Sequence, residues 1–359
     1  MRDNHPMEFG INFFPTHDPS KIGASRYYRE CMELVALCDG LGFHHVRAVE
    51  HYFEPYGGFS PNPTVFLTAA SQHSRKARLI TGAVLPVFNN PLKLAGELGM
   101  LDGFSEGRLE IGFARAFLPH EFERFGIPLD ESRARFEEGM AQVVLLLQCE
   151  NASSDGRFHS FHNVTSLPRP VQQPHPPLWV AAFTTKESFE SAGRNGHGIM
   201  AIPAAGPLMR ELIGLYREAW RSAGHPGQGR VMLTHNVYCG ESEAEVIATA
   251  KAPFNGHLAA LIAAASGWGA GVRSKDYPGY EKMLEGLRGN DFDDMRRRGL
   301  AWCGTSDEIC DMIVTCYRDI PGGVDIVSAQ INFHDLPVGK AAASMRRFSE
   351  RVMPRFRAG

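Results

Sequence analysis

The stretch Glu8-Phe-Gly-Ile-Asn-Phe-Phe14 starts a pattern that recurs along the chain, and its first repeat ends with Phe43-His-His-Val-Arg-Ala-Val49. Both segments are apolar runs of strand length, and turn residues bound the first of them. Between the two segments, apolar residues recur at the spacing of one helix face: Cys31, Leu34, Val35, Cys38 and Leu41. Residues 8–49 are therefore predicted to form a strand, an amphipathic helix and a second strand.

The same alternation continues towards the C-terminus. Six further strand candidates cover residues 79–84, 108–113, 178–182, 197–202, 231–238 and 324–331. Helical patterns separate them, and no break in composition suggests a linker. Eight short apolar strands that alternate with helices are typical of an α/β protein with parallel strands. We predict a single domain, residues 1–359, that folds as a closed (β/α)8 TIM barrel; an open doubly wound sheet is the alternative.

One segment, residues 253–303, interrupts the alternation. It contains an alanine-rich stretch, the sequence Gly267-Trp-Gly-Ala-Gly271 and the basic cluster Arg296-Arg-Arg298. The segment is too long for an ordinary loop between a strand and a helix. We predict an insertion before the last strand, which either forms a lid over the barrel mouth or packs on the outside.

The composition favours a small-molecule ligand. Lys and Arg number 37 against 40 Asp and Glu, so the formal charge is -3 and no strong field attracts nucleic acid or an anionic membrane. There is no apolar run of membrane-spanning length and no apolar N-terminal signal, so a cytoplasmic protein is expected. The seven cysteines include no Cys-x-x-Cys pair, which favours reduced thiols and no metal site.

Two short motifs concern helix boundaries. Gly103-Phe-Ser-Glu-Gly107 matches the nucleophile elbow of hydrolases, but an elbow needs a preceding strand and a following helix, and the pattern here predicts the reverse. The motif is therefore interpreted as a turn. Thr184-Thr-Lys-Glu187 has the spacing of a capping box at a helix start.

Polar residues that follow the predicted strands mark the candidate site, because barrels carry their chemistry on the loops after the strands. His51 follows the second strand and can move protons near neutral pH, although a histidine bonded into a loop is the structural alternative. Arg115 follows the fourth strand and suits a phosphate, unless it pairs with a loop carboxylate. Thr184, Thr185 and Ser188 lie at a helix start whose free amides favour an anion. Together they predict a phosphorylated ligand at the barrel mouth.

A set of short segments, taken together in their order and spacing, carries a family resemblance. These segments are Phe9-Gly-Ile-Asn12, Gly42-Phe43, Val49-Glu-His-Tyr-Phe53, Asn62-Pro63, Leu85-Pro86, Leu101-Asp102, Ser105-Glu-Gly-Arg-Leu-Glu-Ile-Gly112, Phe125-Gly126, Ser132-Arg-Ala-Arg-Phe136, Pro170-Val-Gln-Gln-Pro-His-Pro-Pro-Leu-Trp-Val-Ala181, Cys303-Gly-Thr-Ser-Asp-Glu308 and Val352-Met-Pro354. Through them the chain resembles the bacterial luciferase-like monooxygenase family along nearly its whole length. Only residues from about 240 to 300 have no matching segment.

The resemblance implies a (β/α)8 barrel, often dimeric, that binds reduced FMN or, in some branches, a deazaflavin. By position, His51 matches the catalytic histidine and Arg115 a phosphate-binding arginine, while Thr184, Thr185 and Ser188 lie where the phosphate loop occurs. The segment Thr81-Gly82-Ala83 corresponds to backbone that lies against the flavin ring. Tyr52 stands where luciferases have a second histidine and Ala114 where they have a reactive cysteine, so light emission from an aldehyde is not expected.

The implied reaction is a two-component oxygenation. A separate flavin reductase supplies FMNH2, O2 adds to it to give a flavin hydroperoxide, and a small, largely apolar organic substrate is oxygenated in a closed pocket. A homodimer is expected from the resemblance. The aromatic residues proposed for the pocket lie near strand ends: Phe13, Phe14, Phe53, Tyr56, Phe113 and Phe117. A deazaflavin-dependent hydride-transfer enzyme, a non-catalytic flavin-binding protein and an unrelated barrel hydrolase or isomerase are the alternatives.

Overall fold

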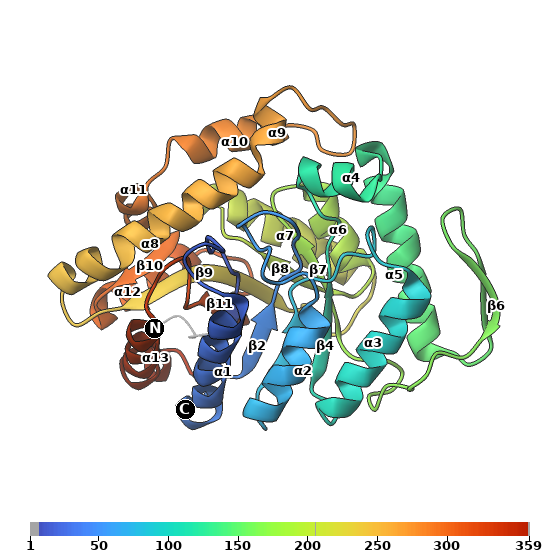
Figure 1. Ribbon diagram of the computed structural model, residues 1–359, viewed down its shortest axis with the longest axis horizontal. Coiled ribbons are helices and arrows are strands. Elements are labelled where there is room, and N and C mark those ends of the chain that lie inside the picture. The colour runs from blue at the N-terminus through green and yellow to red at the C-terminus, as the bar shows by residue number, and fades with distance from the viewer. Residues whose placement is uncertain (1–6, 205, 358–359) are drawn as a thin grey trace.

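A closed parallel barrel forms the centre of the molecule. The computed structural model describes residues 7–204 and 206–357. Strands β8 and β9 pair, as do β11 and β1, so that the sheet closes on itself (Figure 1). In ring order the strands are β1 (Glu8–Phe13), β2 (His45–Ala48), β3 (Arg78–Thr81), β4 (Leu109–Phe113), β7 (Leu178–Ala182), β8 (Gly198–Ala201), β9 (Val231–Cys239) and β11 (Ile326–Gln330). Each corresponds to a predicted strand, so the barrel prediction is confirmed.

Helices cover the outside of the barrel, and local sequence sets their ends. Asn62 and Asn90 accept backbone N–H bonds as N-caps and each precedes a proline, while Gly42 ends the first helix with φ 72°. The surrounding helices are α1 (Ala24–Leu41), α2 (Pro63–His73), α3 (Pro91–Phe104), α4 (Pro119–Phe125), α5 (Ser132–Gln148), α6 (Lys186–Arg194), α7 (Gly206–Ser222), α8 (Glu243–Ala264), α12 (Ser306–Tyr317) and α13 (Val338–Arg351), with 3-10 turns η1 (Leu129–Glu131) and η2 (Met353–Arg355).

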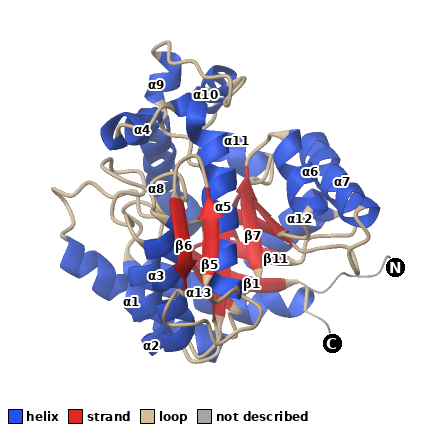
Figure 2. Cartoon of the chain, turned by 90° about the vertical axis from the view of Figure 1, so that its right-hand side faces the viewer, coloured by secondary structure: helices blue, strands red, loops and turns tan. Residues whose placement is uncertain are grey.

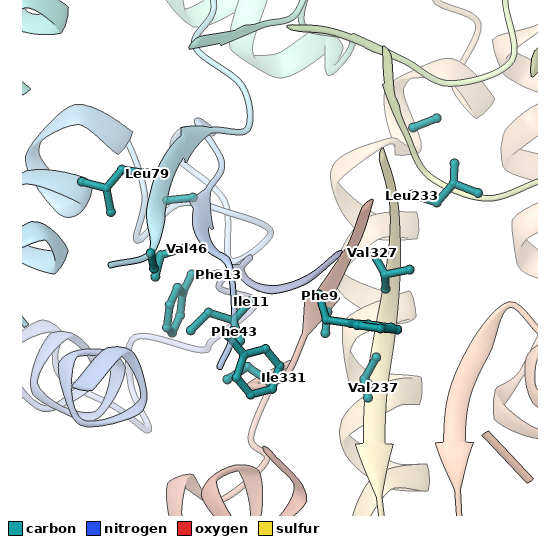
Figure 3. Packing of buried hydrophobic residues seen from close by; sticks show 14 of the residues in the cluster. Phe9, Ile11, Phe13, Phe43, Val46, Leu79, Leu233, Val237, Val327 and Ile331 are labelled. Carbon is teal, nitrogen blue, oxygen red and sulfur yellow. The ribbon is translucent and has the colours of Figure 1, made fainter. Parts of the chain in front are cut away.

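The strand period of two separates two apolar layers. Phe9, Ile11 and Phe13 of β1 point outward to the helices, with Phe9 packed on Phe348 of α13 and Phe13 on Phe66 of α2 (Figure 3). The barrel interior is filled by a separate cluster: Ile80, Trp179, Met200, Met232 and Ile326. Alternate residues of one strand therefore serve different cores.

Three strands escaped the sequence patterns. Strands β5 (Ala152–Asp155) and β6 (Ser160–Val164) form an antiparallel hairpin that lies at the right-hand edge in Figure 1 and faces the viewer in Figure 2. Its polar sequence gives no apolar alternation. Strand β10 (Ala301–Gly304) extends the sheet by pairing with the second half of β9. Residues 301–303 of this strand lie inside the segment 253–303, which the sequence predicted to be an insertion.

The segment 253–303 folds mainly as helices. Helix α8 runs through Pro253, because Val246, Ala250, Phe254 and Leu258 keep one buried face despite the proline. After it come α9 (Ser266–Gly269), α10 (Tyr280–Arg288) and α11 (Phe292–Arg297). The predicted start at residue 253 thus lies inside a continuous helix.

Part of this segment, residues 264–284, packs against the loops that follow the strands. Trp268, Tyr277 and Leu284 are buried in one cluster with Phe14, Tyr56 and Phe122. The Trp268 indole donates to the Phe117 carbonyl at 3.0 Å and the Tyr277 hydroxyl donates to the Ala116 carbonyl at 2.9 Å. We call residues 264–284 the cover segment, since they form a second small core above the barrel.

The seven cysteines are all free thiols, and none of them forms a disulfide. Of the helices in the described ranges, none has the length and hydropathy needed to cross a membrane.

Candidate functional site

A cavity of about 770 Å³ lies where the barrel strands end. Its walls come from the residues after β1 to β4, from the start of α6, and from α5, α8 and α10. Most of the wall is apolar, with a few charged and polar side chains that converge on the space. This size and lining are typical of a pocket for a cofactor or small molecule.

His51 is buried in this wall, directly beyond β2. Its Nδ1 lies 3.0 Å from Oε1 of Glu121, a fully buried residue of α4, and the same oxygen accepts the Tyr52 backbone N–H at 2.9 Å. An N–H at Nδ1 directed to a carboxylate leaves Nε2 as the nitrogen available to a ligand. The Phe14 and Tyr56 rings pack on the imidazole at 5.2 and 5.3 Å.

A glycine makes this packing feasible. A Cβ at Gly57, where φ is +81°, would lie 2.3 Å from the His51 Cβ. Only glycine combines that backbone conformation with so close a contact.

Arg115 follows β4, as predicted, and lines the same cavity. Its guanidinium lies 4.3 Å from the Tyr277 ring centre, a cation-π contact with the cover segment. Within the described residues its Nη1 atom is buried without a hydrogen-bond partner and no carboxylate pairs with it. A buried donor without a partner marks a position that a ligand oxygen can fill.

The helix start after β7 differs in detail from the prediction. Helix α6 begins at Lys186 with Thr185 as N-cap and no side-chain cap bond, so the predicted capping box at residues 184–187 is wrong. The helix starts one residue later than that box requires, which puts Glu187 at the second position and Ser188 at the third. A complete capping box forms instead at Thr305 and Glu308.

The hydroxyl residues at this helix start divide into two groups. Thr185 and Ser188 line the cavity, whereas Thr184 is absent from its wall. Glu187 also lines the cavity, beside the free amides of the helix.

The predicted backbone segment Thr81-Gly82-Ala83 reaches the cavity through its last two residues, whose peptide bond is cis. The Thr81 hydroxyl is buried away from it and exchanges hydrogen bonds with Gly112, at 2.9 Å to the carbonyl and 2.8 Å from the N–H. Thr81 therefore joins β3 to β4.

Three of the six proposed aromatic residues line the cavity: Phe14, Tyr56 and Phe117. The other three do not line it. Phe13 and Phe113 belong to the outer apolar layer, because strand alternation turns them towards the helices. Phe53 has φ 70° and is 53% exposed, and its ring contacts Phe125 and Arg124.

Sequence reasoning missed several buried polar groups of the wall. Glu50 accepts hydrogen bonds from the Leu85 N–H at 3.0 Å, the Asn89 side chain at 2.8 Å and the Tyr52 hydroxyl at 2.5 Å. Burial raises the pKa of the Glu50 carboxyl to about 7, despite these donors. The adjacent pair Glu50-His51 at a strand end was a usable signal for this acid.

Other missed residues come from distant elements. Glu121 anchors His51 from α4, and Arg133 of α5 adds a second cation to the outer wall. His257 of α8 lines the cavity too, and burial lowers its pKa to about 3, so its imidazole is neutral. No spacing in the sequence connects these positions to the strand ends.

The comparison with known proteins agrees with this geometry. The sequence model of a family described as luciferase-like monooxygenase matches residues 7–322. The chain belongs to the luciferase-like monooxygenase family. The family resemblance deduced from the motifs is thereby confirmed.

Three relatives show the range of this family. The crystal structure of monooxygenase RslO1 from Streptomyces bottropensis has a TM-score of 0.87 at 40% identity, over 98% of this chain and 100% of that one. The oxygenase component of a flavin-dependent trigonelline monooxygenase from Acinetobacter baylyi is 33% identical over 220 residues, 60% of either chain. The FMN complex of the oxygenating constituent of 3,6-diketocamphane monooxygenase from Pseudomonas putida shares the fold, with a TM-score of 0.82, 19% identity and coverage of 99% and 100%.

Proposed function

We propose that this protein is the oxygenase component of a two-component monooxygenase that uses reduced FMN and O2 to oxygenate a small, largely apolar organic substrate. The observation that carries the proposal is that His51, oriented by Glu121, and Arg115, with an unpartnered Nη1, face one apolar cavity. Family membership supports it, and so does the trigonelline relative, which is named as an oxygenase component.

The cavity residues suit a flavin phosphate ester. Arg115 and Arg133 supply fixed positive charge at the wall, and Thr185 and Ser188 supply hydroxyls beside the free amides of α6. The wall at Gly82 and Ala83 offers bare backbone to a flat ring. Reduced FMN bound there supplies the electrons that activate O2.

The residues of the chain then have two tasks. His51 presents Nε2 to the reacting oxygen or to the substrate, as a hydrogen-bond partner that can donate or accept a proton according to its charge. Phe14, Tyr56, Phe117 and the cover segment exclude water, which protects a reactive oxygen species from release as H2O2.

We also propose a flavin reductase as partner and a cytoplasmic homodimer as the working form. Seven free thiols suit a reducing compartment. Apolar side chains exposed on α3 and at the start of α2, which pack side by side, offer a surface to a second copy: Leu92, Met100, Phe104 and Val65. Sedimentation of the purified protein tests this, and a monomer at micromolar concentration would contradict it.

The experiment that tests the function mixes the anaerobic protein with reduced FMN and then with O2. We expect the native protein to reoxidise bound flavin more slowly than free flavin reoxidises. The His51→Ala variant should reoxidise it faster than the native protein and release more H2O2, with unchanged affinity for reduced FMN. His44→Ala is the matched control, because His44 lies just before β2 whereas His51 lies just beyond it. Reoxidation equal to that of free flavin, or O2-insensitive hydride transfer with a reduced deazaflavin, would refute the proposal.

The cover segment is proposed as a lid over substrate. Tyr280 lines the cavity close to Phe117, with ring centres 6.2 Å apart. Tyr280→Ala should lower the ratio of product to H2O2 more than the affinity for FMN. An unchanged ratio would make the segment a purely structural part of the fold.

A further inference from the structure

Four polar side chains form an arc at the floor of the cavity. Strand register puts Arg47 of β2 beside Asn12 of β1, Asn12 beside Gln330 of β11, and Gln330 beside Asn236 of β9. All four line the cavity. We call them the polar arc. They lie on four strands that are neighbours in the barrel, and Arg47 is also in register with Ile80 of the apolar interior cluster.

The polar arc has hydrogen-bonding groups that the protein does not use. Asn12 is fully buried, and neither its Oδ1 nor its Nδ2 has a partner in the part of the chain that the structure describes. The same holds there for Nε of Arg47 and Nδ2 of Asn236. Native proteins leave few buried polar atoms without partners, so these atoms point to a ligand that completes them.

Arg47 is the decisive member of the arc. It is 8% exposed, its Nη1 donates to the Thr234 hydroxyl at 2.6 Å and its Nη2 donates to the Gly82 carbonyl at 2.8 Å. Both acceptors are neutral, and no carboxylate of the described residues lies within ion-pair distance. Burial alone lowers the pKa of Arg47 to about 10, so it remains charged at neutral pH.

The chain makes room for this cation. A Cβ at Gly82 would lie 1.9 Å from the Arg47 Nε. A buried positive charge without a negative partner is unfavourable, and the arrangement becomes favourable when an anion binds next to it. The remaining members of the arc add amide groups but no charge.

We propose that the polar arc binds an anionic oxygen, and that the substrate is therefore an organic acid or phenol whose ionised oxygen is held at the cavity floor. This rests on the proposed function. Arg47 supplies the charge, and Asn12 and Asn236 supply further donors. The apolar wall above, with Phe14 and Tyr56, holds the rest of the molecule. The ionised ring of reduced FMN is a second source of the same chemistry.

The test compares two probes of equal shape, 2-naphthoate and 2-naphthamide, by titration calorimetry on the flavin-free protein and again with FMN. We expect at least tenfold tighter binding of the acid to the native protein. Arg47→Met should reduce that preference to less than twofold, and Arg47→Lys should keep part of it. If Arg47→Met does not fold, Asn12→Leu should lower the preference severalfold, and it removes no side-chain hydrogen bond to residues 7–204 or 206–357.

A second measurement distinguishes the two sources of the anionic oxygen, the substrate and the reduced flavin. The affinity for reduced FMN and the pH at which the bound reduced flavin ionises are followed by absorbance under anaerobic conditions. If Arg47→Met changes only the FMN affinity and the pH of flavin ionisation, the bound anion is the flavin and the assignment to substrate is wrong. If neither probe preference nor flavin ionisation depends on Arg47, the polar arc is no anion site. Failure to bind FMN at all would remove the proposed function but leave the naphthoate result valid.

Discussion

The two ends of the barrel differ in whether their buried charged side chains have partners of opposite charge. At the end where the strands begin, Glu110 is almost fully buried, yet it pairs with Arg78 at 2.8 Å and accepts the Trp179 indole N–H at 2.7 Å, while Arg78 and Arg230 both pair with Glu8. At the end where the strands finish, Arg47 and Arg115 have no carboxylate in the described chain. At the first end the buried charges pair within the chain, whereas at the second end the described residues supply no carboxylate to these two arginines.

The difference shows how the same residue types acquire different roles. A charge whose partner is part of the chain contributes to folding and is insensitive to ligand, whereas a charge without a partner lowers stability until a ligand binds. We call the end where the strands begin the closed end and the end where they finish the open end. Substitutions at the closed end should therefore change stability, and substitutions at the open end should change binding.

The largest effect is expected at the closed end. Glu110→Ala removes the buried partner of Arg78 and Trp179, so the free energy of unfolding should fall by about 3–5 kcal/mol. Urea unfolding followed by circular dichroism measures it. FMN affinity of the folded variant should stay within twofold of the native value. A loss below about 1 kcal/mol, or a large change in FMN affinity, would break the distinction between the two ends.

The next effect concerns Glu50 at the open end. Its pKa is about 7, above the ordinary value of 4.5, so between these values the folded state holds a proton that the unfolded state has lost. Stability should therefore fall as pH rises from 4.5 to 7, by up to about 3 kcal/mol. Urea unfolding at several pH values measures this slope. Glu50→Gln should remove most of the slope, and an equal slope in that variant would show that another group causes it.

Arg115→Ala tests the open end directly. It should weaken FMN binding by ~1.5–3 kcal/mol, the contribution of a hydrogen bond to a charged group. In the absence of flavin its unfolding free energy should fall by no more than about 2 kcal/mol, the scale of the lost cation-π contact with Tyr277. Calorimetry with FMN gives the affinity. Unchanged affinity would exclude Arg115 from the phosphate site.

The smallest effect is expected at Phe53, which the structure removes from the pocket. Phe53→Asn keeps a residue type that tolerates φ 70° and should alter the unfolding free energy by less than about 0.5 kcal/mol. The ratio of product to H2O2 should be unchanged. A marked change in that ratio would return this side chain to the substrate site.

The sequence predicted the barrel because each strand is an apolar run and each helix has one apolar face, and both patterns are local. Placing functional residues after strands then predicted His51 and Arg115 at one rim, since parallel strands end on the same side. Helix α8 shows the limit of local rules: Pro253 suggested a boundary, but a buried apolar face continues through it. The hairpin β5–β6 is polar and lacked any pattern to detect.

By itself the sequence determined the eight barrel strands, the helices between them and the residues at the strand ends, because an apolar run and an apolar helix face are local patterns. Only the tertiary structure decided that Glu121 orients His51, that Phe53 and Phe113 lie outside the cavity, and that Arg47 is buried beside Asn12 without an acid. These facts depend on contacts between residues about 35 to 70 positions apart. Which side chains meet, and which charges lack a partner, is set by barrel closure rather than by any local pattern.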